Sequence, residues 1–377
     1  MTTPARPETI ATPRAAGFRQ PAEWAEHRSV WIAWPSHAGL WDEALEPVRR
    51  AWLAMAAAVA DVDPATGAAR GERLEVLVPD AANEAIARER MAGLPARFHR
   101  IPFGDIWLRD TAPVFVAGAE GVAAVSFAFN GWGGKYVLPD DDLVSARVAL
   151  AARMRAFTFP WVLEGGSVEV DGEGTCLTTR QCLLNPNRNP GMPRDEIEEG
   201  LRAALGIESV LWLGNGLRND HTDGHVDTIA RFVAPGTSVC MRASGNDDPN
   251  AAALAAIARD LASFRDAEGR RLTVVEIPSP GLVLDEEGDV MPASYVNFYI
   301  GNRAVVVPVY GRRHDDAALE ALEPLFPGRR VVPVPARDLL TGGGAWHCIT
   351  QQEPGGPGLG SPQTPSAAEG KKAGGTP

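Results

Sequence analysis

Apolar and polar positions along the chain follow a unit that recurs at intervals of roughly sixty residues. Each unit begins with two runs of alternating apolar and polar residues on either side of a turn, which is typical of a β-hairpin. A stretch with apolar residues at helical spacing follows, and then a further strand. The clearest unit has a hairpin over residues 167–184 about Asp171-Gly172, a helix over 194–204 and a strand over 209–213.

The same order of elements repeats twice towards the C-terminus and, less regularly, in the N-terminal third. The two later units are hairpin strands 226–233 and 238–241 with helix 250–263 and strand 271–277, and hairpin strands 295–300 and 304–310 with helix 316–325 and strand 330–334. In the N-terminal third we expect strands 30–34, 74–78 and 97–101, helices 43–60 and 81–92, and a hairpin of 113–117 and 123–129.

A unit that mixes a hairpin with a helix cannot bury its own apolar faces, so the copies should stack around a common axis. The alternative is a parallel sheet covered on both sides, but the hairpins argue against it. The pattern therefore predicts one α/β domain over residues 19–354. Residues 1–18 and the Gly- and Pro-rich tail 355–377 are expected to be disordered.

Composition narrows the range of partners. The 377 residues are 45% hydrophobic, which is enough for a large core, and the net charge is −12. This acidity argues against nucleic acid and anionic membranes; it suits a small cationic substrate, and equally it serves solubility alone. No apolar run reaches membrane-spanning length and no secretory leader is recognisable. We therefore expect a soluble, cytoplasmic protein.

The four cysteines do not form a disulfide or metal-binding pattern, and reduced thiols are expected. Cys176, Cys182 and Cys240 lie in apolar runs and are predicted to be small core residues. Cys348 differs, because the glycine-rich segment TGGGAWHC precedes it. Glycines such as Gly343 let the backbone approach a ligand closely. Cys348 is therefore a candidate nucleophile, provided that a base and an orienting acid lie nearby.

Four segments each place an ionisable group at the start of a unit. They are DIWLRDTAP (105–113), LEGGSV (163–168), DHTDGHVD (220–227) and the cysteine loop (341–354). In strand geometry His225 and Asp227, two residues apart, would face the same side. If the units close around an axis, these groups converge.

A guanidinium group suits such a site. It is planar and cationic with several N–H donors, so paired carboxylates can hold it in its plane. Its carbon is a poor electrophile, but a thiolate placed beneath a rigidly held guanidinium can attack it. The cationic substrate and a protonated histidine would lower the pKa of Cys348 and favour the thiolate.

The motifs WLRDTAP, LEGG, GHVDTIARF, PASYVNFYI and GGGAWHCITQQ resemble those of the agmatine deiminases and bacterial-type peptidyl-arginine deiminases, within the guanidino-group-modifying superfamily. The likeness extends over residues 21–354. It implies a five-bladed α/β propeller of pseudo-symmetric ββαβ units, and no metal or organic cofactor. It also suggests a homodimer.

The resemblance also implies a role for each catalytic residue. Cys348 would attack the guanidinium carbon, and His225 would protonate the departing ammonia and then activate water. Asp110 and Asp227 would bind the guanidinium nitrogens, and Glu164 would orient His225. The expected reaction converts agmatine to N-carbamoylputrescine and ammonia, a step towards putrescine and other polyamines. Arginine and peptidyl-arginine are the alternative substrates.

Other residues are assigned by type and place. Trp107, Trp132 and Trp346 are candidates for an aromatic wall against a cationic chain, with Gly343 beside them. Trp31 and Trp34 are expected in the core, and His221 and His347 are expected to be structural or at the rim. The sequence departs from the family pattern at Ala112, Ser167 and Ala345-Trp346.

Two other functions compete with the deiminase hypothesis. The density of acids and histidines over 220–227 suggests a two-metal hydrolase that splits guanidines, but no second pair of aspartates accompanies it. A non-catalytic binding propeller would have lost at least one catalytic position, and all five are present.

Overall fold

The recurring unit folds as five small mixed sheets within residues 12–356, the range that this computed structural model describes. In the three-stranded sheets the first two strands are antiparallel, and the third lies parallel to the second. Their strands are β4 (Val114–Gly118), β5 (Gly121–Ala128) and β6 (Arg155–Val162); β7 (Glu169–Val170), β8 (Thr175–Thr179) and β9 (Ser209–Leu213); β10 (Ala230–Ala234), β11 (Thr237–Arg242) and β12 (Thr273–Pro278); and β13 (Tyr299–Ile300), β14 (Ala304–Val309) and β15 (Arg330–Pro335).

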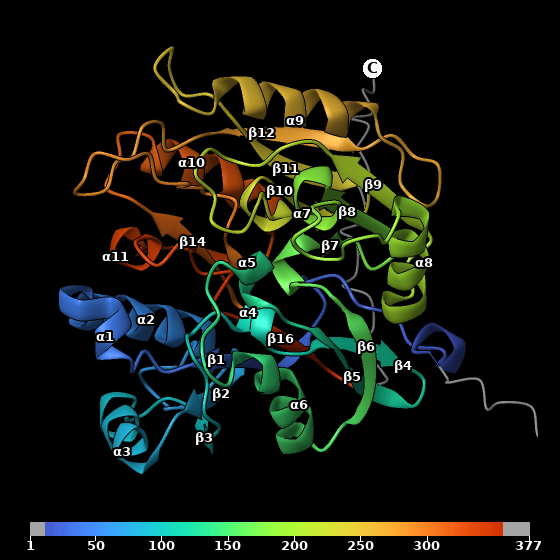
Figure 1. Ribbon diagram of the computed structural model, residues 1–377. Coiled ribbons are helices and arrows are strands. Elements are labelled where there is room, and N and C mark those ends of the chain that lie inside the picture. Colours follow the sequence, from blue (N-terminus) through green and yellow to red (C-terminus); the bar gives the residue numbers. More distant parts are fainter. Residues whose placement is uncertain (1–11, 357–377) are drawn as a thin grey trace, which may run out of the picture.

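The remaining sheet joins the two ends of the described chain. Its order is β16 (Gln351–Pro354), β1 (His27–Ala33), β2 (Arg73–Val78) and β3 (Ala96–Arg100). The C-terminal strand β16 pairs antiparallel with β1 and so takes the place of a hairpin partner (Figure 1). Ser29 Oγ and Trp31 Nε1 both donate to Glu353 Oε2, each at 2.9 Å. This pairing fixes the segment that directly follows Cys348.

The longer helices lie at the perimeter, and the short helix α4 and strand β16 lie near the middle (Figure 1). The longer helices are α2 (Leu45–Ala60), α3 (Ala81–Arg90), α6 (Asp141–Ala152), α8 (Arg194–Leu205), α9 (Ala251–Ser263) and α10 (Asp315–Leu322). The short α-helices are α1 (Ala38–Trp41), α4 (Leu108–Thr111), α5 (Gly131–Gly134), α7 (Arg180–Leu183) and α11 (Arg337–Leu340). The 3₁₀ turns are η1 (Arg14–Ala16), η2 (Asp42–Ala44), η3 (Gly165–Ser167), η4 (Val226–Thr228) and η5 (Glu323–Leu325).

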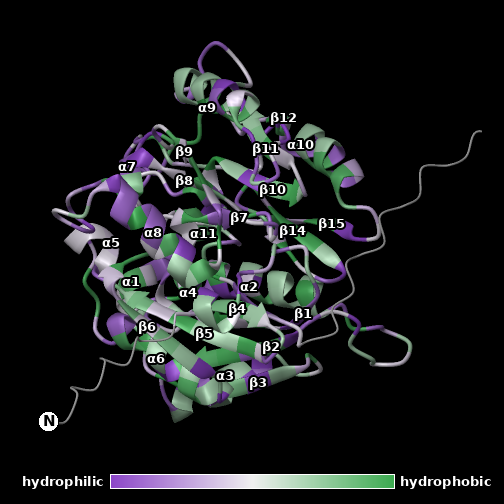
Figure 2. Ribbon diagram, turned by 90° about the vertical axis from the view of Figure 1, so that its right-hand side faces the viewer, coloured by the Kyte–Doolittle hydropathy of each residue, from purple (hydrophilic) through white to green (hydrophobic). Residues whose placement is uncertain are grey.

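Local sequence accounts for the form of these helices. The buried residues of α8 follow helical spacing, from Ile197 through Leu201 to Leu205, and Gly206 ends the helix in the left-handed conformation. Asp80 caps α3 by accepting a hydrogen bond from the Asn83 main-chain N at 2.8 Å. Strands are largely hydrophobic in Figure 2, whereas hydrophilic residues colour parts of the outer helices.

Sequence patterning missed helix α6 and strand β6. The apolar residues of α6 are spread around the helix instead of forming one face, since Leu143 and Leu150 are 45% and 79% exposed. Strand β6 contains Pro160, which weakens a strand pattern. The expected strand over 226–233 begins instead with the turn η4, and the strand expected over 295–300 forms only at its last two residues, as β13.

The expected disorder of residues 1–18 is wrong for the part that the structure describes. Phe18 is 4% exposed and packs with the core, and Arg19 exchanges main-chain hydrogen bonds with Ala117. Residues 1–11 and 357–377 lie outside the described range.

The core contains the residues that were expected there. Trp31 and Trp34 are buried, as are Cys176, Cys182 and Cys240, and all four cysteines are free. None of the helices within residues 12–356 combines the length and the apolar character needed to cross a bilayer.

Candidate active site

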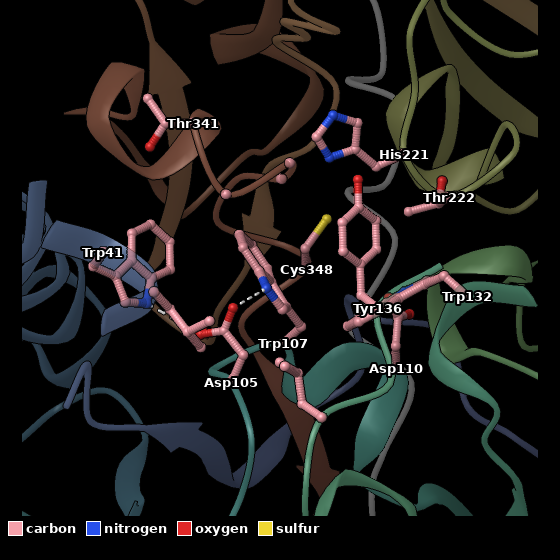
Figure 3. A pocket seen from close by; sticks show the side chains of 15 residues that line it. Trp41, Asp105, Trp107, Asp110, Trp132, Tyr136, His221, Thr222, Thr341 and Cys348 are labelled. Atoms are coloured by element: carbon pink, nitrogen blue, oxygen red, sulfur yellow. Dashed lines mark hydrogen bonds between the residues drawn. The ribbon is translucent and has the colours of Figure 1, made fainter. Parts of the chain in front are cut away.

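Cys348 lies in a pocket of about 220 Å³, and its sulfur points inward (Figure 3). Glycines make room for it. A Cβ atom on Gly344 would lie 3.0 Å from Cys348 Sγ and 2.8 Å from the Trp107 ring. Gly343, with φ at 105°, also lines the pocket. The full lining is Leu40, Trp41, Asp105, Trp107, Asp110, Trp132, Tyr136, Leu138, His221, Thr222, Thr341, Gly342, Gly343, Gly344 and Cys348.

Three ionisable side chains from distant segments converge on Gly166. A Cβ atom there would lie 2.6 Å from His225 Nδ1 and 3.0 Å from both Asp110 Oδ1 and Asp227 Oδ2. The second glycine of LEGG is therefore required by the crowding of catalytic candidates around it. His225 directly precedes the 3₁₀ turn η4 and Asp227 lies within it, so the strand geometry assumed from their spacing is wrong. Both side chains nevertheless face Gly166.

Asp110 is held rigidly at the pocket. Its Oδ1 accepts from the Gly166 main-chain N, and its Oδ2 accepts from Trp132 Nε1, both at 2.9 Å. Burial, together with repulsion from Asp227 and Glu164, raises the pKa of Asp110 to about 8. The Asp110 carboxyl is therefore largely protonated at neutral pH when no cation faces it.

Asp227 has the opposite electrostatic surroundings. Its Oδ2 accepts from His347 Nδ1 at 2.7 Å and lies 3.8 Å from Cys348 Sγ. Burial would raise its pKa, but the hydrogen bond and the charge of His347 hold the pKa of Asp227 below its usual value. Within the described chain its Oδ1 has no hydrogen-bond partner, so that oxygen can accept from a ligand.

His225 is fully buried and keeps both ring nitrogens free of hydrogen bonds to the described residues. Nδ1 lies 3.8 Å from Asp110 Oδ1. Burial lowers the pKa of His225 to about 3, so the ring is neutral at physiological pH. A neutral imidazole can accept a proton, which a general base must do.

Glu164 does not form the hydrogen bond to His225 that the resemblance implies. Its Oε1 accepts from Arg188 Nε at 2.6 Å, although Glu164 also lies within 4.8 Å of His225. Burial raises the pKa of Glu164, and Arg188 opposes that shift. Ser167, a departure from the family pattern, donates to the Glu164 main-chain O at 2.5 Å and so stabilises the LEGG turn.

The thiol of Cys348 is protonated in the substrate-free site. Burial raises the pKa of Cys348 well above its usual value, and the charges of Asp227 and Asp110 add to the shift. The Asn297 amide lies 3.3 to 3.4 Å from Sγ. Sequence reasoning gave Asn297 no role, although it lies in the quoted motif PASYVNFYI.

Of the three tryptophans proposed for the aromatic wall, two line the pocket and one does not. Trp107 and Trp132 line the pocket. Trp346 does not: it is fully buried, and its Nε1 donates to the Val334 main-chain O at 3.1 Å. The expectation that Trp346 forms part of the wall is therefore wrong. Its indole faces strand β15 because the segment turns between Trp346 and Cys348.

Two further pocket residues escaped the sequence reasoning. The Asp105 carboxylate accepts from Trp41 Nε1 at 3.1 Å and from Trp107 Nε1 at 2.8 Å, which fixes both indoles (Figure 3). Tyr136 lies beside His221, with ring centroids 5.7 Å apart. His221 therefore lies at the rim as expected, whereas His347 is buried beneath Asp227.

The acids of segment 220–227 do not gather as a two-metal site would require. Asp223 pairs with Lys135 at 2.9 Å and with Arg188 at 2.6 Å, whereas Asp227 faces His347. Two other groups in the described chain have ligand spacing: Glu164, Cys182 and His225, and Glu23, Glu169 and His347. An arginine already binds the carboxylates of each, Arg188 in the first and Arg231 in the second.

Comparison with known proteins identifies the family to which the chain belongs. The Porphyromonas-type peptidyl-arginine deiminase family matches the chain over residues 19–354. The agmatine deiminase of Pseudomonas aeruginosa (strain LESB58) is 40% identical over 368 residues, covering 91% of this chain and 97% of that relative. The agmatine deiminase of Stutzerimonas stutzeri (strain A1501) is 39% identical, with the same coverage. Among solved structures, agmatine deiminase of Enterococcus faecalis has a TM-score of 0.83 at 33% identity, covering 93% of this chain and 100% of that one.

Five mixed sheets and a buried thiol beside two carboxylates and a histidine define the class: an α/β protein with a cysteine-centred, acid-lined site. The chain belongs to the Porphyromonas-type peptidyl-arginine deiminase family.

Proposed function

We propose that this protein is a C–N hydrolase that converts agmatine and water to N-carbamoylputrescine and ammonia. One observation carries the proposal: Cys348 Sγ lies 3.8 Å from Asp227, and Asp227, Asp110 and His225 surround Gly166. This arrangement offers a nucleophile, a base and two acids to a single planar cation. The relatives at about 40% identity, which are agmatine deiminases, support it.

The architecture we infer is a single domain over 19–354, built as a five-bladed α/β propeller of ββαβ units. The five sheets and the pairing of β16 with β1 support that arrangement. Such closure explains how groups more than a hundred residues apart meet at one pocket.

The first half-reaction forms a covalent intermediate. The guanidinium binds between Asp110 and Asp227, and His225 takes the proton of the Cys348 thiol. The thiolate attacks the guanidinium carbon, a C–S bond forms, and the C–N bond to one terminal nitrogen breaks. His225 returns its proton to that nitrogen, which leaves as ammonia.

In the second half-reaction His225 removes a proton from water, and the resulting hydroxide attacks the carbon of the thiouronium. The C–S bond breaks as the hydroxyl proton of the adduct passes to the sulfur, so the ureido product leaves and the thiol is restored. His225 then releases its proton to solvent and is again a neutral base. Asp227 and Asp110 bind the nitrogens throughout, and their charges stabilise the imidazolium that forms transiently at His225.

The pocket lining favours agmatine over arginine. None of its residues is Lys or Arg, and beyond the catalytic groups it offers the Asp105 carboxylate and the rings of Trp41 and Tyr136. A primary ammonium would be attracted to these groups. The α-carboxylate of arginine would meet Asp105 without a counter-ion, which is costly in a partly desolvated site.

An ammonia-release assay with agmatine, arginine, an arginyl peptide and guanidinobutyrate tests the proposal. We expect kcat/KM for agmatine to exceed that for each carboxylate-bearing compound by at least about 100-fold, since an unpaired buried charge costs several kcal/mol. If the enzyme prefers arginine or the peptide, the proposed substrate is wrong but the proposed reaction, deimination of a guanidine, stands. Failure to release ammonia from any guanidine would overturn the proposal itself.

Agmatine binding should release a proton at neutral pH. Below about pH 8 the free Asp110 carboxyl is protonated, whereas a bound guanidinium favours the carboxylate, so the proton leaves on binding. Calorimetry of Cys348→Ala in buffers of different ionisation enthalpy should show about one proton released per site at pH 6, and release should vanish well above pH 8. In the matched variant Cys348→Ala with Asp110→Asn, the release should be lost at both pH values.

A further inference from the structure

One buried histidine beside the site has no part in the steps above. His347 Nδ1 lies 2.7 Å from Asp227 Oδ2, and His347 Nε2 lies 2.7 Å from Glu23 Oε2. A neutral imidazole has a single N–H donor, whereas an ionised carboxylate only accepts. Two ionised carboxylates at this distance both accept a hydrogen bond from the ring only when each ring nitrogen carries an N–H, which is the imidazolium form.

The second carboxylate that contacts His347, that of Glu23, is held in its ionised form. Glu23 Oε2 accepts from Arg231 Nη2 and its Oε1 from the Ile300 main-chain N, both at 2.7 Å. Burial opposes ionisation, but Arg231 and His347 hold the pKa of Glu23 well below its usual value. Arg231 is held in turn by Glu169 at 2.9 Å. Glu23 therefore places a buried negative charge 2.7 Å from His347 Nε2.

We propose that His347, held as an imidazolium by Glu23, is a positioning residue that keeps Asp227 ionised and oriented before the substrate binds. The proposal rests on the function assigned above, because Asp227 is there the acid that receives the guanidinium. With Oδ2 bound to His347, the unpartnered Oδ1 remains to accept from the substrate.

Comparison of the two acids supports this role. Asp110 and Asp227 are both buried and both lie against Gly166. Among the described residues Asp110 accepts from two neutral donors, Trp132 and the Gly166 main chain, and its pKa rises to about 8. Asp227 accepts from His347, and its pKa falls below the usual value. Asp227 is thus stabilised as an anion by His347, whereas Asp110 has no cation bound to it and is repelled by Asp227 and Glu164.

The main chain of His347 also helps to fix the position of Cys348. It directly precedes Cys348, its main-chain N donates to the Asn297 O at 3.2 Å, and its main-chain O accepts from Arg109 Nε at 3.3 Å. The charged and titratable groups around His347 and Asp227 are Glu23, Glu169, Arg109, Arg231, His225, Asp110 and Cys348.

Two substitutions distinguish the contributions of the two ring nitrogens of His347. In His347→Asn the amide nitrogen lies near the place of Nδ1 and can still donate to Asp227. In His347→Gln it lies near the place of Nε2 and can donate only to Glu23. Both remove the charge. If the role of His347 is purely structural, the two variants should lose similar amounts of kcat/KM for agmatine. If His347 positions Asp227, His347→Gln should lose more kcat/KM than His347→Asn.

The first measurement counts ring protons in the wild-type enzyme by NMR of ¹⁵N-labelled histidine at pH 7.5, with the His347 signals identified by their loss in either variant. We expect an N–H on each nitrogen of His347. A single ring N–H would overturn the proposal. This readout requires no turnover, so it stands even if agmatine is not the substrate.

The second measurement is the proton release on agmatine binding in the Cys348→Ala background at pH 6. With His347 present, Asp110 alone contributes, and about one proton is released. Adding His347→Gln removes the cation beside Asp227, so Asp227 also binds a proton and the release rises towards about two. An unchanged release in His347→Gln would contradict the proposal. Absence of ammonia release by the wild-type enzyme would instead count against the proposed function.

Discussion

Replacing Cys348 with serine is expected to reduce kcat for agmatine by on the order of 10⁴-fold or more, because the hydroxyl is far less acidic than the thiol and a delocalised guanidinium is a poor electrophile. Binding should survive, since Asp110 and Asp227 are unchanged. The measurement is steady-state ammonia release together with calorimetric titration of agmatine.

Cys240→Ser is the matched control, because Cys240 is also buried and free but does not line the pocket. It reports any cost of burying a hydroxyl in place of a thiol, and its kcat should stay within about threefold of wild type. Comparable turnover by Cys348→Ser and Cys240→Ser would rule out covalent catalysis at Cys348. Mass spectrometry of rapidly quenched wild-type enzyme should also show the amidino adduct on Cys348.

Asp227→Asn is expected to have the next largest effect. Removing one partner of a buried charge pair costs about 2–5 kcal/mol, or roughly 30- to 5,000-fold in kcat/KM. The substitution should also lower Tm, because it leaves the His347 cation with one carboxylate in place of two. Steady-state kinetics and thermal unfolding at pH 7 measure the two effects.

Asp110→Asn should behave differently, because the Asp110 carboxyl is already largely neutral at pH 7. Its Tm should change little, while kcat/KM falls because the acid can no longer ionise against the guanidinium. Asp248→Asn is the control: Asp248 is buried and hydrogen-bonded to Ser244 and Asn250, and it does not line the pocket. Equal losses of Tm in Asp110→Asn and Asp227→Asn would contradict the assigned protonation states.

Much of the fold could be predicted from the chain because each unit repeats the same local signals. Strand β9 and helix α8 fall within one residue of their predicted bounds, since turn residues mark their ends. Helix α6 was missed because its buried face includes Asp141 and Ser145 while Leu143 and Leu150 are exposed, so its apolar residues do not mark one face. The burial of Phe18 depends on contacts with distant strands that local pattern does not reveal.

The residues of the site were likewise predicted in part. Cys348, His225, Asp227, Asp110 and Glu164 were named from motifs, and the structure brings Cys348, Asp227, Asp110 and His225 together. Trp346 was misplaced because a one-residue step along a turn decides which way a side chain faces. Glu23 and Asn297 were missed because neither lies in a segment that looks catalytic by composition.

The sequence by itself determined the repeating unit and which residue types are available for chemistry, because both are written in local spacing. Tertiary structure alone decided the charge states. Asp110 and Asp227 are the same residue type at the same depth, yet one faces an indole and an amide N–H and the other an imidazolium. Which neighbour each carboxylate meets depends on how remote segments pack, and in a desolvated site that neighbour sets the proton equilibrium.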